Sequence, residues 1–314
     1  MTNTMTTTEL LKTRSKMAQK MRAFFDGQGF IEVETPILVS NPGLEPHLKY
    51  FETTFAADMG DNTLGHNKFY LPTSPEYSLK KVLSKLEHPA KIYELARAFR
   101  NGEISKTHQP EFSMLEFYCT QFSLEELSNV CFELFSELAS LGSSSSDWNL
   151  RQDFDLETLF IKHANTDFPS LRKTSSNFSE DFHLLFLNKI EPELRSLPGQ
   201  IYLWNYPIEE AMLAKACLDD PYKAHRFEIF FNGAELGNAF DELLEETTLM
   251  NRCKTHYQQR IALYNQSPEI DLDFIKSCSE LKHMEVSGIA IGWDRLLMKI
   301  LKIDTLRETL SLPH

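Results

Sequence analysis

The segment AFRNGEISKTHQPEFSMLEFY, residues Ala98–Tyr118, decides how the rest of the chain is interpreted. Alternating apolar and polar residues predict one strand over Lys91–Phe99 and a second over Glu111–Tyr118, joined as a hairpin. The polar loop between the two strands carries three basic side chains, those of Arg100, Lys106 and His108. We therefore expect a β-hairpin with a long, cationic tip.

The outgoing strand of this hairpin has a chemically mixed face. A period of two places four side chains together on it: Phe112, Met114, Glu116 and Tyr118. An aromatic ring can stack on a base, the cations of the loop can bind phosphates, and a carboxylate can bind an amine. The pattern suits a nucleotide, although an amphipathic hairpin with a charged tip is often purely structural.

The composition limits the class of protein. With 314 residues, 42% of them hydrophobic, the chain can bury a large core. A formal net charge of −13 argues against sequence-independent binding of nucleic acid, which relies on many Lys and Arg contacts to phosphates, but it allows a local basic patch. The sequence contains no apolar run of membrane-spanning length and no signal-peptide core, so we expect a cytoplasmic protein with no membrane partner.

The cysteines favour the same location. The chain has five, and no pair shows Cys-x-x-Cys spacing: Cys119, Cys131, Cys217, Cys253 and Cys278. An odd number without that spacing predicts reduced, buried thiols, with neither a disulfide framework nor a zinc site.

Several elements are predicted around the hairpin. Apolar residues at helical spacing predict an amphipathic helix over Glu9–Phe25, followed by a strand over Phe30–Val39. Pro36 cannot donate to a sheet ladder, so this strand is expected at an edge or an interface. Two further helices are predicted over Ser123–Leu141 and Glu242–Tyr264.

Another helix is predicted within Leu71–Leu86. Ser74 is a suitable N-cap, Pro75 suits the first helical position, and Glu76 complements the helix dipole in the first turn. Capping alone is sufficient to explain Ser74 and Glu76, without any role in function.

The serine run Ser143–Ser146 is the one linker-like segment of the sequence. A domain boundary there would separate the chemically informative segments, so we interpret it as a surface loop within a single domain spanning residues 1–314. Residues 143–200 show helical patches without recognisable chemistry, and we expect them to form a peripheral insertion.

A second hairpin is predicted around Asn232-Gly233, the strongest short turn signal in the chain. With a two-residue turn, Glu228 lies opposite Gly237 and diagonal to Glu235 on the same face. Diagonal neighbours are about 7–8 Å apart. Both carboxylates could therefore share a hydrated Mg²⁺ with the phosphates of a nucleotide, although paired acids on a solvated face are usually inert.

The last informative segment is Ser287–Leu301, SGIAIGWDRLLMKIL. Small residues at Gly288, Ala290 and Gly292 alternate along a strand and leave one face bare, so that a ligand can approach the backbone. A helix follows with Arg295 in its first turn, where the helix dipole favours acids. Such a local misfit indicates a functional residue more than a stabilising one.

Three of these segments resemble the signatures of class II aminoacyl-tRNA synthetases in their lysyl form. They are G-F-x-E-V-E-T-P, then F-R-N with H-x-P-E-F-x-M-L-E-x-Y, then G-x-A-x-G-x-D-R, with T-S-P-E-Y and E-L-G-N-A-F between them. The match covers Glu9–Leu301. It implies an α+β fold with an antiparallel sheet of about six strands flanked by helices, and a homodimer whose interface is built by the first signature.

Within this family the chain most resembles the truncated paralogues that ligate (R)-β-lysine to elongation factor P. It leaves no room for the amino-terminal OB-fold that reads the anticodon, and it has Ser74 and Ala290 where synthetases usually have Ala and Gly. The resemblance implies that ATP and Mg²⁺ are used to form a β-lysyl adenylate, which is transferred to a lysine side chain of elongation factor P, with no tRNA. Alternatives are an enzyme for α-lysine with tRNA or a small-molecule acceptor, and a non-catalytic regulatory paralogue.

The resemblance also assigns residues, position by position. Arg100 and Arg295 are the implied catalytic residues, with Arg100 on the α-phosphate and the substrate carboxylate. The implied ATP site consists of Arg100, Asn101, Gly102, Glu103, His108, Gln109, Phe112, Glu235, Leu236, Gly292 and Arg295. The implied amino-acid site consists of Ser74, Pro75, Glu76, Glu116, Tyr118, Asn238, Glu242 and Ala290, and the implied Mg²⁺ ligands are Glu228 and Glu235. The family's usual Glu after F-R-N is Gly102 here, so Glu103 is expected to take over its contact to adenine.

Overall fold

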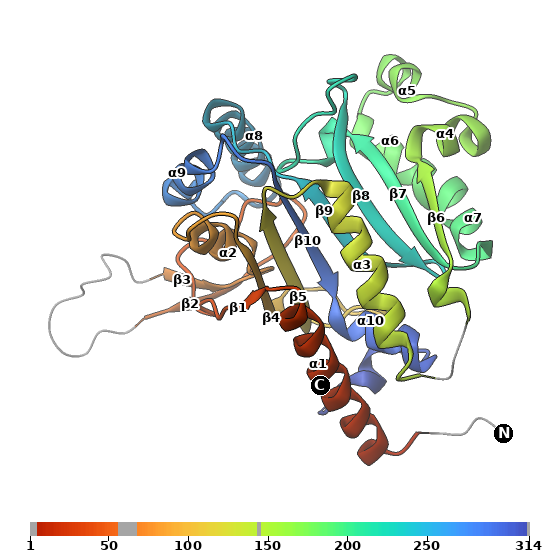
Figure 1. Ribbon diagram of the computed structural model, residues 1–314. Helices are drawn as coiled ribbons and strands as arrows, with labels where there is room; N and C mark the ends of the chain where they lie inside the picture. Colours follow the sequence, from red (N-terminus) through yellow and green to blue (C-terminus); the bar gives the residue numbers. More distant parts are fainter. Residues whose placement is uncertain (1–4, 56–67, 143–145, 313–314) are drawn as a thin grey trace, which may run out of the picture.

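The computed structural model describes residues 5–55, 68–142 and 146–312. Within these residues the centre is an eight-stranded sheet in the order β1-β4-β5-β10-β9-β8-β7-β6 (Figure 1). Its strands are β1 Ile31–Glu32, β4 Lys91–Phe99, β5 Glu111–Thr120, β6 Arg151–Asp155, β7 Gln200–Pro207, β8 Lys223–Phe231, β9 Ala234–Asp241 and β10 Val286–Gly292. A separate pair is formed by β2 Phe51–Thr54 and β3 Lys68–Leu71.

Helices cover the central sheet, so the predicted α+β class is confirmed. The helices are α1 Thr7–Gly27, α2 Glu76–Leu83, α3 Leu124–Ala139, α4 Leu156–Leu159, α5 Phe168–Thr174, α6 Phe178–Leu185, α7 Glu191–Ser196, α8 Glu246–Tyr264, α9 Leu272–Glu280 and α10 Trp293–Leu301. Short 3₁₀ segments are Ser146–Asn149, Ile208–Glu210 and Leu306–Thr309, and two π-helical turns are η2 Phe160–Ala164 and η3 Phe186–Ile190.

The central sheet is mixed, which corrects the prediction of an antiparallel sheet with about six strands. The hairpin β4–β5 is antiparallel as predicted, but the outermost pairs β1–β4 and β6–β7 are parallel. Both parallel pairs are linked by long crossovers, the second through α4 to α7, as parallel pairing requires. Turn patterns in a sequence predict which consecutive strands pair as antiparallel hairpins. They do not predict which strands pair in parallel after a long crossover connection.

The predicted helices at α1 and α3 are confirmed, and each begins with a capping box. In α1 the pair is Thr6 and Glu9, and in α3 it is Ser123 and Glu126. In both, the hydroxyl oxygen accepts from one orphan backbone N–H while the carboxylate accepts from another.

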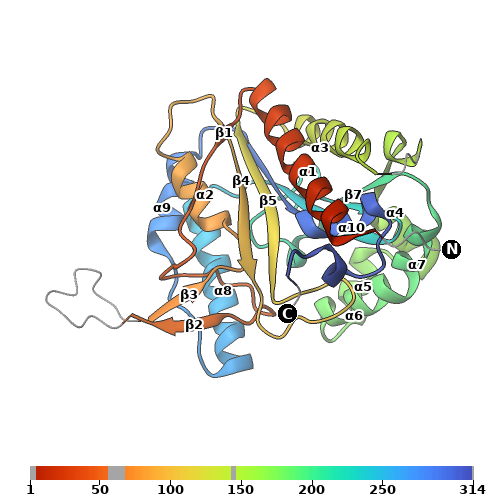
Figure 2. The ribbon, with the colours of Figure 1, turned by 90° about the horizontal axis from the view of Figure 1, so that it is seen from below.

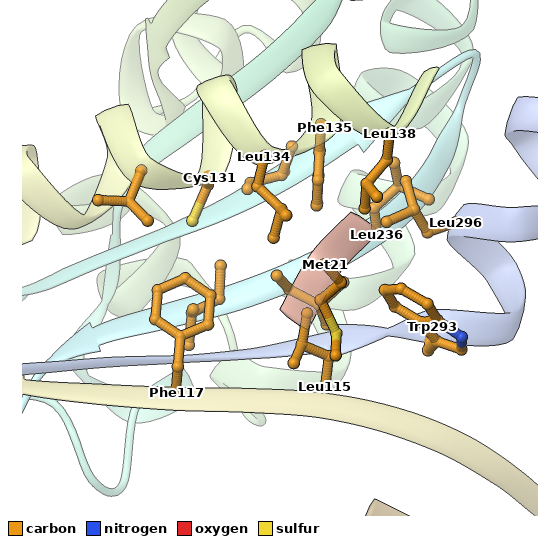
Figure 3. Close-up of a cluster of buried hydrophobic side chains, with 14 of the residues drawn as sticks. Met21, Leu115, Phe117, Cys131, Leu134, Phe135, Leu138, Leu236, Trp293 and Leu296 are labelled. Atoms are coloured by element: carbon orange, nitrogen blue, oxygen red, sulfur yellow. The ribbon is translucent and has the colours of Figure 1, made fainter. Parts of the chain in front are cut away.

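The helices α1, α3 and α10 pack over one face of the sheet (Figures 1 and 2). Figure 3 shows this core, in which side chains of α3 point toward β5, with Trp293 of α10 at one end. Leu115 and Phe117 of β5 are fully buried there. Because side chains alternate along a strand, Met114, Glu116 and Tyr118 must face the opposite side of the sheet.

The opposite face is covered in part by α2, α8 and α9, which form a second apolar cluster. Leu79 and Leu83 of α2 pack there with Leu249 of α8 and Phe274 of α9. Beside this cluster, the polar face of β5 lies under the loop that joins β4 to β5. The alternation predicted for β5 thus places apolar side chains in the core on one face of the sheet and Met114, Glu116 and Tyr118 on the other face.

Residues 146–200 form the far end of the sheet. Their helices enclose an apolar cluster with β7 and β8 that includes Phe160, Phe182 and Leu203. The helical patches are as predicted, but the strand β6 was not. Its sequence RQDFD is short and charged, which is typical of a protected edge and gives a weak strand signal. The predicted loop Ser143–Ser146 falls mostly outside the described residues.

Three predicted boundaries are wrong. The strand expected over Phe30–Val39 is regular only at Ile31–Glu32, and it lies at the sheet edge as Pro36 suggested. The helix expected from Glu242 begins at Glu246, because the side chain of Glu245 accepts from two backbone N–H groups and caps it. In α2 the N-cap is Pro75, and the Ser74 hydroxyl instead accepts from the backbone N–H of Glu76 at 3.3 Å.

All five cysteines are free, as predicted, and four are buried, whereas Cys217 is partly exposed between β7 and β8. Among residues 5–55, 68–142 and 146–312, no helix combines the length and apolar character needed to cross a lipid bilayer.

Candidate active site

The polar face of the sheet opens into a cavity of about 480 Å³ under the loop between β4 and β5. Twelve of the residues that the resemblance assigns to ATP, metal or substrate line it: Arg100, Glu103, His108, Gln109, Phe112, Glu228, Glu235, Leu236, Asn238, Ala290, Gly292 and Arg295. We call this space the nucleotide cavity. It is formed by the two predicted hairpins and the β10–α10 junction, so segments far apart in the sequence meet there.

At one end of the nucleotide cavity, Arg295 and His108 lie side by side. The Nη1 group of Arg295 donates to the carbonyl oxygen of Glu235 at 2.6 Å, and Nη2 lies 3.2 Å from Nε2 of His108. Nδ1 of His108 is 2.8 Å from the Ser105 hydroxyl. Burial and the neighbouring guanidinium of Arg295 lower the pKa of His108, which favours a neutral ring that accepts at Nε2 and donates at Nδ1.

Arg100 also lines the nucleotide cavity. Its guanidinium carbon is 5.3 Å from the centre of the Phe112 ring, and its Nη1 is 4.0 Å from Oε2 of Glu103. The Nε atoms of Arg100 and Arg295 are buried, and neither has a hydrogen-bond partner among the described residues. Both cations therefore retain donors for an anionic ligand.

A second cavity of about 330 Å³ continues from the first along the polar face. Six of its lining residues also line the nucleotide cavity: Leu48, Arg100, Met114, Arg226, Asn238 and Ala290. Its other walls carry Ser74, Glu76, Glu116 and Tyr118, all assigned to the amino acid. We call this space the amino-acid cavity. Arg100 thus faces both cavities at their junction.

The amino-acid cavity is strongly acidic. Burial and the nearby Glu76 raise the pKa of Glu116 well above its ordinary value, and the Tyr118 hydroxyl donates to Glu116 at 3.2 Å. Burial and Glu76 also raise the pKa of Glu45, which no sequence signal identified, to about 7. Carboxylates this close in a dry environment favour protons unless a cation enters.

One such cation is built into the protein. Lys80 of α2 is 2% exposed, and its ammonium lies 2.7 Å from Oε1 of Glu76 and 2.5 Å from Oε2 of Glu242. Burial raises the pKa of Glu242 to about 8, against the lowering effect of Lys80. The sequence reasoning missed Lys80, although its i,i+4 spacing from Glu76 on a predicted helix is an available signal.

The hairpin β8–β9 has the predicted turn, with Asn232 and Gly233 both at positive φ, but its register differs. Glu228 pairs with Asn238 and not with Gly237, because a β-bulge between Glu235 and Gly237 adds one residue to β9. Phe230 pairs with Glu235, so Glu228 is still diagonal to Glu235 on one face.

Glu228 is already engaged within the protein. Its Oε2 accepts from the Tyr206 hydroxyl at 2.5 Å, and its Oε1 accepts from Arg226. Burial, followed by the effect of Glu235, raises the pKa of Glu228 to about 7. Arg226 also donates to Oδ1 of Asn238 at 2.9 Å. Sequence reasoning missed Arg226, although it precedes Glu228 by two residues and therefore shares its face.

Four assigned residues lie apart from these two cavities. Asn101 lines a different cavity of about 350 Å³ and donates to the backbone carbonyl of Tyr50 at 3.3 Å. Gly102 is in a turn at φ +86°, with open space where a side chain would be. Pro75 caps α2, and Glu242 is buried beneath the amino-acid cavity at 1% exposure.

The bare backbone expected at Gly288 is occupied by protein. A methyl group there would overlap the ring of Tyr118 and lie 2.9 Å from Oε1 of Glu242. Gly288 still lines the amino-acid cavity, so the approach of a ligand to its backbone stays a prediction. Ala290 and Gly292, farther along β10, do line the nucleotide cavity.

Comparison with known proteins gives a consistent family. Residues 2–314 match the family model described as tRNA synthetases class II (D, K and N). A protein of Proteus mirabilis (strain HI4320) named elongation factor P–(R)-β-lysine ligase is 33% identical over 97% of this chain and 94% of its own length. Proteins of the same name from Buchnera aphidicola subsp. Acyrthosiphon pisum (strain APS) and Yersinia pestis (strain Pestoides F) are 33% and 31% identical, over 97% of this chain and 95% and 94% of their own lengths. The chain therefore belongs to the class II tRNA synthetase family of the D, K and N type.

Proposed function

We propose that this protein uses ATP to activate (R)-β-lysine as its adenylate and transfers the β-lysyl group to a lysine side chain of elongation factor P. The observation that carries the proposal is the place of Arg100 at the junction of a nucleotide cavity and an acidic amino-acid cavity. One guanidinium there can contact a phosphate on one side and a carboxylate on the other. The names of the relatives supply the pair of substrates.

In the first step, a carboxylate oxygen of β-lysine attacks the α-phosphorus of ATP, and pyrophosphate leaves. No protein nucleophile is required, so catalysis depends on positioning and on stabilising the charge that develops on the phosphate. Arg100 is placed to bind the carboxylate and the α-phosphate. Arg295 and His108 line the nucleotide cavity but not the amino-acid cavity, and so are placed to bind the outer phosphates. Phe112 and Glu103 are our candidates for contacts to adenine.

In the second step, the uncharged ε-amine of the acceptor lysine attacks the carbonyl carbon of the adenylate. An amide bond forms, AMP leaves, and one proton is lost from the amine. We assign the two ammonium groups of β-lysine to Glu76 and Glu116, which line the amino-acid cavity, and to Glu242 directly beneath it, with Tyr118 and Asn238 beside them. Because the substrate carries two ammonium groups, several carboxylates are needed to bind it.

Mg²⁺ is the ion we propose to accompany ATP, held by Glu235 and Glu228. Among the described residues no group of three or more His, Cys, Asp or Glu side chains could hold a metal, so the ion would take most of its ligands from phosphates and water. One oxygen of Glu228 accepts from Tyr206 and the other accepts from Arg226. Each oxygen therefore has only one lone pair left for a metal ion. Glu235 is thus the better candidate. When bound, the ion would neutralise charge on the phosphates.

We propose a homodimer through the first signature segment. Three apolar residues in or directly after that segment are exposed, namely Ile31 within it at 54%, and Ile37 at 49% and Leu38 at 45% after it. A contact between two copies would cover them. Sedimentation of the wild type against Ile37→Asp tests this, because the variant should sediment as a monomer.

The acceptor separates this proposal from its alternatives. Pyrophosphate exchange should first be measured with α-lysine, (R)-β-lysine and (S)-β-lysine. Labelled β-lysine, ATP and Mg²⁺ are then incubated with purified elongation factor P or with total tRNA. We expect label only in the factor, because the net charge of −13 opposes a polyanion beyond local patches. Label in tRNA would support a synthetase, and no exchange with any isomer would support a regulatory paralogue.

We further propose that the chain works as one catalytic domain, in the cytoplasm. In support, α6 and η3 of the expected insertion line another cavity of about 650 Å³, which is also lined by His108, Glu235 and Arg295. The insertion thus contributes a wall next to the site of the outer phosphates.

A further inference from the structure

Lys80 is a charged residue that the adenylation chemistry leaves without a role. We infer that it is a fixed internal ammonium group. It balances one of the three carboxylates that the proposed function assigns to the substrate, Glu76, Glu116 and Glu242, and so leaves two of them for ammonium groups of the substrate. This inference rests on the proposed function, because it assigns those two positions to a diammonium acid.

The geometry fixes Lys80 in place. It projects from the buried side of α2, and its side chain is 3% exposed. Its Nζ atom contacts Glu76 from its own helix and Glu242 from the segment after β9, at 2.7 and 2.5 Å. The rings of Tyr118 on β5 and Phe274 on α9 lie 5.6 and 5.8 Å away. An ammonium enclosed by two carboxylates and two aromatic rings has little freedom to leave.

Each of the two carboxylates keeps one oxygen that Lys80 does not contact. Oε1 of Glu242 is buried, it has no hydrogen-bond partner among the described residues, and it lies toward Gly288 and Tyr118. A buried acceptor without a donor is costly. A donor from the substrate would satisfy it.

The charges match when the substrate is included. Glu76, Glu116 and Glu242 carry three negative charges when all are ionised. Lys80 balances one, and the two ammonium groups of a diammonium acid balance the other two. Without a substrate the third carboxylate is best kept protonated, consistent with the raised pKa of Glu116.

Other charged and titratable groups surround this set from every packed element. The acids and weakly acidic groups are Glu45 in the loop before β2, Glu94 on β4, Tyr118 on β5, Glu209 and Glu210 after β7, Asp241 at the end of β9 and Cys278 on α9. The basic groups are Arg100 at the junction of the cavities, Arg226 on β8, His47 in the loop before β2 and His256 on α8. None of them is a second cation in contact with Glu242. Asp241 has its own partner, since it accepts from Lys215 at 2.6 Å.

The test is a reciprocal pair of substitutions. Lys80→Met keeps the length of the side chain and removes its charge, and Glu242→Gln keeps the shape and removes the opposite charge. Each alone should raise the KM for (R)-β-lysine in pyrophosphate exchange about tenfold or more, with the KM for ATP within about twofold of wild type. The double variant has two carboxylates for two substrate ammonium groups, so its KM should lie closer to wild type than that of either single variant.

A purely structural Lys80 gives a different result. Its loss would change kcat and the KM for ATP as well, and the two substitutions would be additive, with about a hundredfold increase in the double variant. That outcome overturns the inference. It is also overturned if Lys80→Met and the double variant both fail to fold while Glu242→Gln folds, because charge balance would then be irrelevant.

The pH dependence of unfolding tests the same charge count without a substrate. In Lys80→Met, two buried carboxyl groups lose their cation, so the folded state retains a proton on them. The unfolded chain has released this proton, because its Glu side chains have pKa values of about 4.3. The folded state then binds more protons, so stability falls as pH rises. From pH 5.5 to 8.5 the single variant should lose stability relative to wild type, and the double variant should lose clearly less. Absence of exchange in wild type would refute the proposed function alone, and parallel curves for all three proteins would refute the role of Lys80.

Discussion

The two cavities of the active site solve opposite electrostatic problems. In the nucleotide cavity the protein supplies the guanidinium groups of Arg100, Arg226 and Arg295. The carboxylates of Glu103, Glu228 and Glu235 line the same cavity, and the Nε atoms of Arg100 and Arg295 have no hydrogen-bond partner among the described residues. In the amino-acid cavity it supplies carboxylates that are buried and crowded, with Lys80 as an internal counter-ion. A guanidinium stays charged at any ordinary pH, whereas a buried carboxylate can take up a proton. The guanidinium groups of the nucleotide cavity therefore keep their charge without a ligand, whereas the buried carboxylates of the amino-acid cavity need a cation or a proton.

The largest effect should come from the junction. Arg100→Ala removes a cation that lines both cavities. ATP–pyrophosphate exchange should therefore fall by about 10²–10³ or more, since losing one charge-stabilising donor has this effect. The measurement is the rate of ATP–pyrophosphate exchange at saturating ATP and β-lysine.

A control for this variant is Arg97→Ala. Arg97 lies on β4, three residues earlier, and its side chain is 47% exposed, with Glu111 at 3.8 Å. Its loss should leave exchange within about twofold, because exposed ion pairs contribute little. Equal losses in both variants would show that Arg100 supports the hairpin and does not serve the junction.

The same comparison explains what could be predicted from sequence. The nucleotide cavity is built from local patterns: a period of two on β5, an Asn-Gly turn, and alternating small residues on β10. Each is visible in a short window, and each was found. The register error at Glu228 arose because a bulge at Leu236 leaves no signal in a turn-based count.

The amino-acid cavity depends on contacts between distant segments. Lys80 meets Glu242 across 162 positions of sequence, and nothing local to either residue specifies that distance. Glu45 lines the cavity from an irregular loop. A loop has no hydrophobic periodicity that would predict where its side chains lie. Similarly, Tyr118 covers Gly288 because β5 and β10 pair in a register that places them opposite each other. Only the tertiary structure supplies these relations.

The next largest effect should separate the two cavities. Glu242→Gln should raise the KM for (R)-β-lysine about tenfold or more and leave the KM for ATP nearly unchanged, because a charge-assisted hydrogen bond contributes roughly 1.5–3 kcal/mol. Steady-state exchange with each substrate varied in turn provides both constants. Glu280→Gln on α9, an exposed carboxylate, is the matched control. An unchanged KM for the amino acid in Glu242→Gln would remove Glu242 from the site.

A smaller effect is expected from pH. Burial raises the pKa of Glu242 to about 8 and of Glu45 to about 7, so the free cavity holds protons that a substrate ammonium must displace. Proton release on binding means that affinity rises with pH until these groups are ionised. Between pH 6.5 and 8.5 the KM for β-lysine should therefore fall several-fold. The KM for ATP should change less, since Arg100 and Arg295 do not titrate in this range. Parallel profiles for the two substrates would contradict the contrast between the cavities.

The smallest effect concerns Ala290, which lines both cavities and pairs with Glu116 and Asn238 on the neighbouring strands. Moving the amine from the α- to the β-carbon lengthens the path from carboxylate to ammonium, so discrimination must arise near the carboxyl end of the substrate. The methyl group of Ala290 lies in that part of the site. One methyl group changes the free-energy difference between two substrates by about 1 kcal/mol or more. Ala290→Gly should thus shift the ratio of kcat/KM between β-lysine and α-lysine about fivefold toward α-lysine, without abolishing activity. Ala239→Gly is the control, because Ala239 faces the apolar core on β9 and should lower stability without changing the ratio. If the wild type used both isomers with equal kcat/KM, selectivity for β-lysine would have no basis in this cavity.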